Sequence, residues 1–130
     1  MKTTGHGLII EEGRTKILPL AQLEIPVYGD LGFQRGDAVF ETILARGSNL
    51  FHIEDHAKRL TDSCAQVAIP VTIDAQRIVE EALSLARENV SLFSQSTLRI
   101  IVSTCTDDGL PISGSSRVTM FQYPFRDYPR

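Results

Sequence analysis

Two amphipathic helical segments follow one another directly between β-branched segments, and this order constrains the fold most. In the first segment, Ile53–Ala68, apolar residues recur at spacings of four and three and form one stripe: Ile53, Ala57, Leu60, Cys64 and Val67. Pro70 ends this segment, and Asp74 is a good N-cap for the second, Ala75–Asn89. Because strands are expected before and after the pair, the order predicts an α+β fold, an antiparallel sheet covered on one face by two helices.

Alternating and β-branched residues predict the strands of this sheet. They are expected at Leu8–Ile10, Ile17–Leu20, Ala38–Ala45, Leu50–His52, Thr97–Thr104 and Arg117–Tyr123. The intervening Ile25–Asp37 is rich in glycine and is expected to be a structured loop, and Asp107-Asp108-Gly109 a turn. On Ala38–Ala45, the alternation places Glu41 and Phe40 on opposite faces.

Composition excludes several classes of protein. The net charge of −3 argues against a nucleic-acid-binding surface, and no apolar run approaches the length of a membrane span. The N-terminus lacks the apolar core of a signal peptide. Cys64 and Cys105 lack metal-ligand spacing, so we expect no metal site and free thiols in a cytoplasmic protein.

Two short motifs carry the chemistry. The first is Gly36-Asp37-Ala38-Val39-Phe40-Glu41-Thr42, a glycine turn that leads into a strand. The second is His56-Ala57-Lys58-Arg59-Leu60, in which His56 and Arg59 lie one turn apart beside the apolar stripe of the first helix. A guanidinium offers a planar fork of donors that matches the oxygens of a phosphate dianion. The second motif therefore suggests a phosphate-binding arginine.

Together, at this separation, the motifs resemble those of the N-terminal domain of the fold-type IV pyridoxal-phosphate enzymes. These are the class IV aminotransferases, which include branched-chain and D-amino-acid aminotransferases, together with aminodeoxychorismate lyase. The resemblance covers roughly residues 8–124. It implies pyridoxal 5′-phosphate as cofactor and small-molecule amino acids and 2-oxo acids as partners, with no nucleic acid and no membrane. It also implies a homodimer.

The resemblance implies roles for three residues. Arg59 would hold the cofactor phosphate, against the alternative of a surface arginine on a helix. Phe40 would line the substrate pocket, or else be a core aromatic. Arg99 would contact the substrate carboxylate, although Thr97 stands where relatives carry a tyrosine; the alternative is a strand arginine facing solvent. If these roles hold, Arg59 and Phe40 should face one common concave surface.

Structural roles are expected for His56 and Glu41. His56 would support Arg59 or local structure, and Glu41 would make a structural hydrogen bond. Two departures from the family pattern, Leu44 and Ser103-Thr104-Cys105, fall where substrate specificity is usually set. No substrate is therefore carried over from the family.

The Schiff-base lysine that pyridoxal-phosphate catalysis requires has no match in this chain. In the family it lies in a second domain, and the lysines here, Lys2, Lys16 and Lys58, fit no motif. We therefore expect residues 1–123 to be the N-terminal α+β domain and 124–130 the start of an interdomain linker, with the C-terminal catalytic domain absent. No catalytic residue is assigned.

The sequence thus predicts the N-terminal part of a branched-chain-type aminotransferase, inactive as an isolated chain. Three alternatives stay open: part of an aminodeoxychorismate lyase-type enzyme, a non-catalytic assembly domain of the same fold, and an unrelated α+β binding domain. Self-association is expected through the face that bears Phe40 or through the aromatic tail, Tyr123, Phe125 and Tyr128.

Overall fold

An antiparallel sheet with the strand order β2-β1-β6-β5-β3-β4 forms the centre of the computed structural model, which describes residues 4–107 and 115–126. The strands are β1 His6–Glu11, β2 Arg14–Pro19, β3 Ala38–Arg46, β4 Asn49–Leu50, β5 Gln95–Cys105 and β6 Ser115–Pro124. The helices are α1 Leu31–Arg35, α2 Ile53–Gln66 and α3 Ala75–Glu88, with a short 3₁₀ turn at Leu20–Gln22. β1 pairs with β6 as well as β2, and Leu8 lies opposite Met120.

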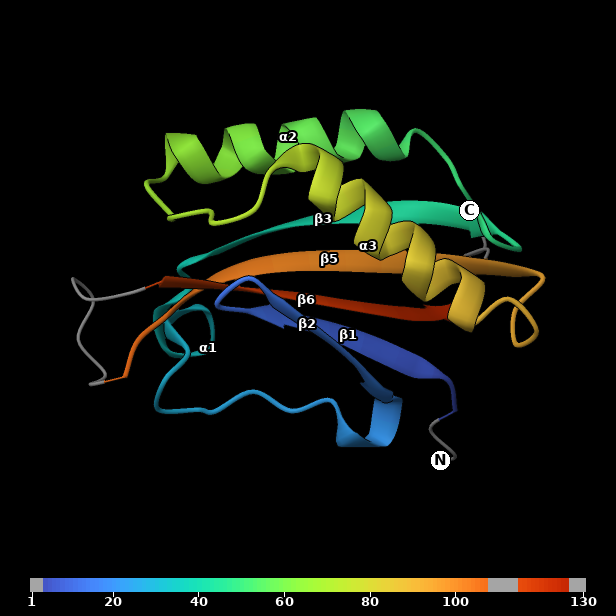
Figure 1. Cartoon of the computed structure of the whole chain (residues 1–130), viewed down its shortest axis with the longest axis horizontal. Helices are drawn as coiled ribbons and strands as arrows, with labels where there is room; N and C mark the ends of the chain where they lie inside the picture. The colour runs from blue at the N-terminus through green and yellow to red at the C-terminus, as the bar shows by residue number, and fades with distance from the viewer. Residues whose placement is uncertain (1–3, 108–114, 127–130) are drawn as a thin grey trace.

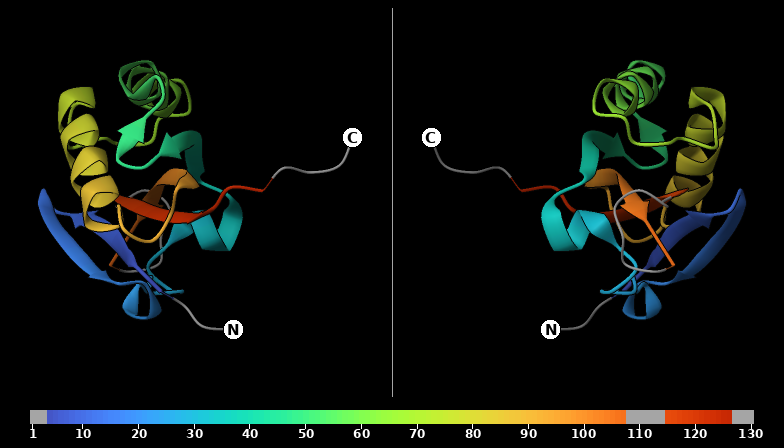
Figure 2. Two further views of the ribbon diagram at one scale, coloured as in Figure 1. Left: turned by 90° about the vertical axis from the view of Figure 1, so that its right-hand side faces the viewer. Right: turned by 90° about the vertical axis from the view of Figure 1, so that its left-hand side faces the viewer.

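Helices α2 and α3 lie side by side over one face of the twisted sheet, while α1 lies beneath the opposite face (Figures 1 and 2). The core fills the space between this helical layer and the sheet. Its largest fully buried side chains include Leu8, Ile43, Leu60, Ile78, Leu85, Leu98, Ile100 and Met120. The predicted α+β architecture is confirmed.

Side-chain alternation divides β3 as the sequence predicted, and β5 follows the same pattern. Ile43 on β3 and Leu98 on β5 are buried beneath the helices. The alternate residues, such as Phe40 and Arg99, point to the other side. We call the sheet face that points away from α2 and α3 the open face.

A short helix was missed in the segment expected to be a loop. The side chain of Asp30 accepts a hydrogen bond from the Phe33 amide at 2.8 Å and so caps the N-terminus of α1. Gly36 ends the helix with φ 79°, in the left-handed region that glycine enters without strain. Both signals are legible in the sequence, but five residues are too few to produce a helical apolar period.

Three further predictions differ in detail. β4 ends at Leu50, because His52 adopts a left-handed conformation with φ 55° and is the N-cap of α2. α2 ends at Gln66, so Val67 lies beyond its last turn and is exposed rather than part of the apolar stripe. Asp74 caps α3 as predicted. The predicted turn at Asp107-Asp108-Gly109 lies mostly outside the described residues.

Candidate functional site

Glu41, His56 and Arg59 meet at the outer part of the sheet, and we call them the Glu41 cluster. Glu41 lies on β3 and points toward the helical layer. His56 and Arg59 are three residues apart on α2, so they project from neighbouring positions on the helix surface toward the same carboxylate.

The carboxylate of Glu41 binds both partners. Arg59 donates from Nε to Oε1 at 3.0 Å and from Nη2 to Oε1 at 2.6 Å. Nδ1 of His56 lies 2.6 Å from the same Oε1. Because an ionised carboxylate can only accept, Nδ1 carries the proton and donates. Nη2 of Arg59 lies 3.2 Å from this Nδ1, and two donors at that separation make no hydrogen bond.

The surroundings of Glu41 favour the ionised form of its carboxyl group. Burial alone would raise the pKa of the Glu41 carboxyl, but the hydrogen bonds from Arg59 and His56 outweigh burial and hold that pKa below its ordinary value. Glu41 in turn raises the pKa of the Arg59 guanidinium. The side chain of Arg59 is nevertheless 65% exposed, so the ion pair orients a charge that solvent and ligands can reach.

Phe40 and Arg99 meet on the open face, away from the Glu41 cluster. The guanidinium carbon of Arg99 lies 5.1 Å from the centre of the Phe40 ring and 5.8 Å from that of Tyr123. Phe40 is 59% exposed and is therefore no core aromatic. Within the described residues, Nε of Arg99 is buried and has no hydrogen-bond partner.

Arg59 and Phe40 approach β3 from opposite faces of the sheet, and the expectation that they line one concave surface stays a prediction. Arg59 binds Glu41 on the helix side of β3, whereas Phe40 stacks on Arg99 on the open face. Neighbouring residues of a strand point to opposite sides, so partners of Glu41 and of Phe40 must lie on opposite faces. Along Ala38–Leu44, β5 pairs with one edge of β3, and no described strand pairs with the other edge. The two groups thus flank an open sheet edge.

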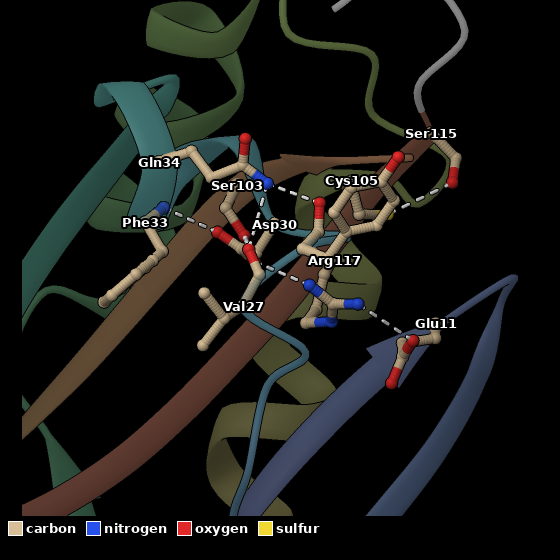
Figure 3. A network of polar contacts seen from close by, with 10 residues as sticks. Glu11, Val27, Asp30, Phe33, Gln34, Ser103, Cys105, Ser115 and Arg117 are labelled. Atoms are coloured by element: carbon tan, nitrogen blue, oxygen red, sulfur yellow. Dashed lines mark hydrogen bonds and ion pairs between the residues drawn. The ribbon is translucent and has the colours of Figure 1, made fainter. Parts of the chain in front are cut away.

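A buried polar network at the other end of the sheet was not predicted (Figure 3). Asp30 and Arg117, 1% and 3% exposed, form an ion pair with 2.5 Å between Oδ2 and Nη1. Ser103 donates to the same Oδ2 at 2.9 Å, and Glu11 accepts from Arg117 at 3.3 Å. The network ties the segment before α1 to β5, β6 and β1.

Close contact between backbone segments reinforces this attachment. A Cβ atom at Gly32 would lie 2.7 Å from Cβ of Ser103, so only glycine lets α1 approach β5 so closely. The amide of Thr106 donates to Gly29 O at 2.8 Å. In the sequence, this network appears only as an arginine and an acid that lie far apart in the chain. The two cannot be paired without knowledge of the fold.

Other candidate sites are not supported. Cys64 is buried and Cys105 is partly exposed, and both are free thiols, as predicted. Burial raises the pKa of the Cys64 thiol. Within residues 4–107 and 115–126, no three metal-ligating side chains cluster, and no helix has the length and apolarity of a membrane span.

A sequence profile described as amino-transferase class IV matches residues 38–129, which include the second motif and the first motif from Ala38 onward. The chain belongs to the class IV aminotransferase family. No curated protein matches the chain.

Solved structures agree with this membership. The branched-chain amino acid aminotransferase of Escherichia coli matches with a TM-score of 0.79 at 19% identity, over 96% of this chain and 41% of that one. A hypothetical Mycobacterium tuberculosis aminotransferase in its PLP-bound form matches with a TM-score of 0.68 at 25% identity, over 88% and 39%.

The 4-amino-4-deoxychorismate lyase of Pseudomonas aeruginosa matches with a TM-score of 0.67 at 27% identity, over 95% and 41%. The chain therefore spans about two fifths of the length of these relatives. The fold of this chain is that of the N-terminal part of class IV enzymes.

Proposed function

We propose that this chain supplies the phosphate-facing and substrate-facing half of a pyridoxal-phosphate-dependent aminotransferase. In this proposal Arg59 contacts the cofactor phosphate, while Phe40 and Arg99 contact the amino acid or 2-oxo acid between which the amino group moves. When bound, pyridoxal phosphate stabilises the negative charge that develops on the substrate carbon. Membership of the class IV family and the PLP-bound M. tuberculosis relative support this cofactor.

One observation carries the proposal: an exposed arginine whose orientation is fixed by a carboxylate. Glu41 takes the Nε–Nη2 edge of the Arg59 guanidinium. The opposite edge, which includes Nη1, has no hydrogen-bond partner among the residues that the structure describes. A guanidinium has donors left over after one bidentate contact, and phosphate oxygens match this remaining fork. These residues therefore fit a phosphate group.

A positioned arginine binds more tightly than a mobile one because less side-chain entropy is lost when the ligand arrives. Glu41 and His56 provide that positioning here. The arrangement gives each member of the cluster a role: Arg59 binds, Glu41 orients it and balances its charge, and His56 fixes the carboxylate.

We further propose that the isolated chain binds the cofactor weakly and does not catalyse. Lys58 is exposed on α2, and Lys16 lies on β2 beside Glu11 and Glu12, in neither the Glu41 cluster nor the Arg99 contact. A lysine from another segment would have to bind the cofactor covalently and transfer the proton that leaves the substrate carbon. On this proposal residues 1–123 act as one domain, 124–130 begin the linker, and the complete enzyme is a cytoplasmic homodimer.

Inorganic phosphate and pyridoxal phosphate, titrated separately into the chain and followed by ¹⁵N NMR, test the phosphate role. Weak saturable shifts are expected around residues 56–60, and Arg59→Gln should abolish them. Lys58→Gln removes the neighbouring charge on the same helix and should retain binding. Equal loss in both variants would mean that charge alone, rather than Arg59, attracts the ligand.

The P. aeruginosa lyase at 27% identity favours a second candidate, part of an aminodeoxychorismate lyase-type enzyme. A non-catalytic assembly domain of the same fold is the third. Assays of amino transfer and of lyase activity with added pyridoxal phosphate should give only the free-cofactor background. Turnover above that background, abolished by Lys16→Ala or Lys58→Ala, would contradict the inactivity proposed here.

A further inference from the structure

His56 contacts both charged members of the Glu41 cluster. Its Nδ1 donates to Oε1 of Glu41 at 2.6 Å, and the same Nδ1 lies 3.2 Å from Nη2 of Arg59. Oε1 also accepts from that Nη2 at 2.6 Å. One carboxylate oxygen, one ring nitrogen and one guanidinium nitrogen therefore form a triangle, in which a change of charge on one member acts directly on the other two.

The imidazole is the member of this triangle whose side chain type changes its charge near neutral pH. Nδ1 already carries a proton, so a second proton would be taken up at Nε2. That nitrogen has no hydrogen-bond partner among the residues that the structure describes. The side chain of His56 is 19% exposed, so solvent can reach the ring without any opening of the fold.

Two opposite charges act on this second proton. The carboxylate of Glu41 attracts it, and the guanidinium of Arg59, in contact with the ring, repels it. An anion on the free edge of Arg59 would offset the repulsion and add a negative charge on the same side of the ring. The imidazolium form of His56 would then be more favourable than it is in the chain without ligand.

The other charges around α2 are directed elsewhere or screened by solvent. Asp55 lies 3.8 Å from His52 and is 88% exposed. On α3, which packs against α2, Arg77 binds Glu81 and the turn between β1 and β2, at the far edge of the sheet. Arg46 lies at the far end of β3. The remaining charged residues of the two helices are exposed: Glu54, Lys58, Asp62, Glu80, Arg87 and Glu88.

We propose that protonation of His56 tightens anion binding at Arg59, so that the site takes up a proton together with a phosphate group. The inference rests on the phosphate role proposed for Arg59 and adds a pH dependence to it. Linkage makes the two effects equal. The factor by which a proton on His56 raises the anion affinity is also the factor by which the anion raises the proton affinity of His56.

Sulfate is the probe, because it resembles a phosphate dianion but keeps its own charge across the neutral pH range. It is titrated into the full chain without cofactor and followed by ¹⁵N NMR at residues 56–60. Sulfate should bind roughly threefold to fivefold more tightly at about pH 6 than at about pH 8.5, since one nearby charge contributes up to that factor. With saturating sulfate, the ring resonances of His56 should titrate about half a pH unit higher than without it.

His56→Gln and His52→Gln are a matched pair of variants. Glutamine at position 56 keeps a donor for Glu41 but cannot be protonated, so its sulfate affinity should not change with pH. His52→Gln removes an imidazole that is 79% exposed and lies beside Asp55, and it should keep the full change. If His56→Gln does not fold, ring titrations of the unchanged chain with and without sulfate test the same linkage. The rings of His6 and His52 are then the internal references.

Two results would overturn the proposal. One is a sulfate affinity that changes equally with pH in His56→Gln and His52→Gln, because general charge would then account for the change. The other is a His56 ring that titrates at the same pH with and without sulfate. The phosphate role of Arg59 fails on different observations: no sulfate shifts at residues 56–60 at any pH, or shifts that persist in Arg59→Gln. Binding that is independent of pH leaves that role intact and refutes only the linkage.

Discussion

At the scale of single residues, Glu41 determines how the candidate site is arranged. It is the acceptor that His56 and Arg59 share, and its position on β3 sends Phe40 to the opposite face. The two motifs identified Arg59 and Phe40 as residues of interest from sequence. That they lie on opposite faces of β3 also follows from strand alternation, once Glu41 is seen as the partner of Arg59.

Glu41→Gln should change the pH dependence of stability. The folded-state pKa of Glu41 lies below its ordinary 4.5, so its contribution is present above that pH and is lost as pH falls through the folded-state value. At pH 7 the variant should be less stable by on the order of 1–2 kcal/mol. Urea denaturation across pH 3–7 should show this difference shrinking toward zero in acid.

The control is Glu24→Gln, which removes an exposed loop carboxyl outside the Glu41 cluster. Its stability should follow that of the unchanged chain at each pH. A difference for Glu41→Gln that stays constant down to pH 3 would contradict a depressed pKa.

At the scale of elements, the periodic segments were predictable, whereas the short helix α1 was not. α2 and α3 have apolar stripes long enough to identify, and β3, β5 and β6 have clear alternation. α1 lacks any such period, and its position depends on Asp30 meeting Arg117, which is far away in the chain. The buried network could not be read from sequence because only the register of β5 and β6 brings its members together.

Asp30→Asn should detach α1 from the sheet and destabilise the fold. The change leaves the buried guanidinium of Arg117 without its closest negative partner, which costs about 3–5 kcal/mol. Urea denaturation measures the cost, and hydrogen exchange should report faster opening of residues 31–36.

Asp37→Asn is the matched control. Asp37 pairs with Arg35 at 2.9 Å on the surface, where an ion pair contributes less than about 1 kcal/mol. If both variants lose the same small amount, the Asp30–Arg117 pair does not anchor α1.

At the scale of the whole molecule, the two sheet faces differ in what covers them. The helices bury one face, while Phe40, Phe33 and Ile25 remain exposed on or beside the open face. A groove of about 360 Å³ there is lined largely by apolar side chains, including Phe33, Ile101 and Phe121. Contiguous apolar surface of this kind favours association.

We therefore expect the isolated chain to self-associate through the open face. Light scattering after size exclusion should give a mass that rises with concentration, and Phe40→Ser should reduce that rise. Val67→Ser removes an equally exposed apolar side chain beyond α2, away from the open face, and should have no effect. A mass that stays monomeric at high concentration would count against the expectation.

The pairing of β1 with β6 has a consequence for synthesis. Leu8 emerges early from the ribosome, yet its partner Met120 is among the last described residues to appear. Until then β1 has only β2 beside it, and an isolated two-stranded hairpin is marginal in water. We expect the nascent chain to stay open, and to need protection from chaperones, until β6 is free to join the two halves of the sheet.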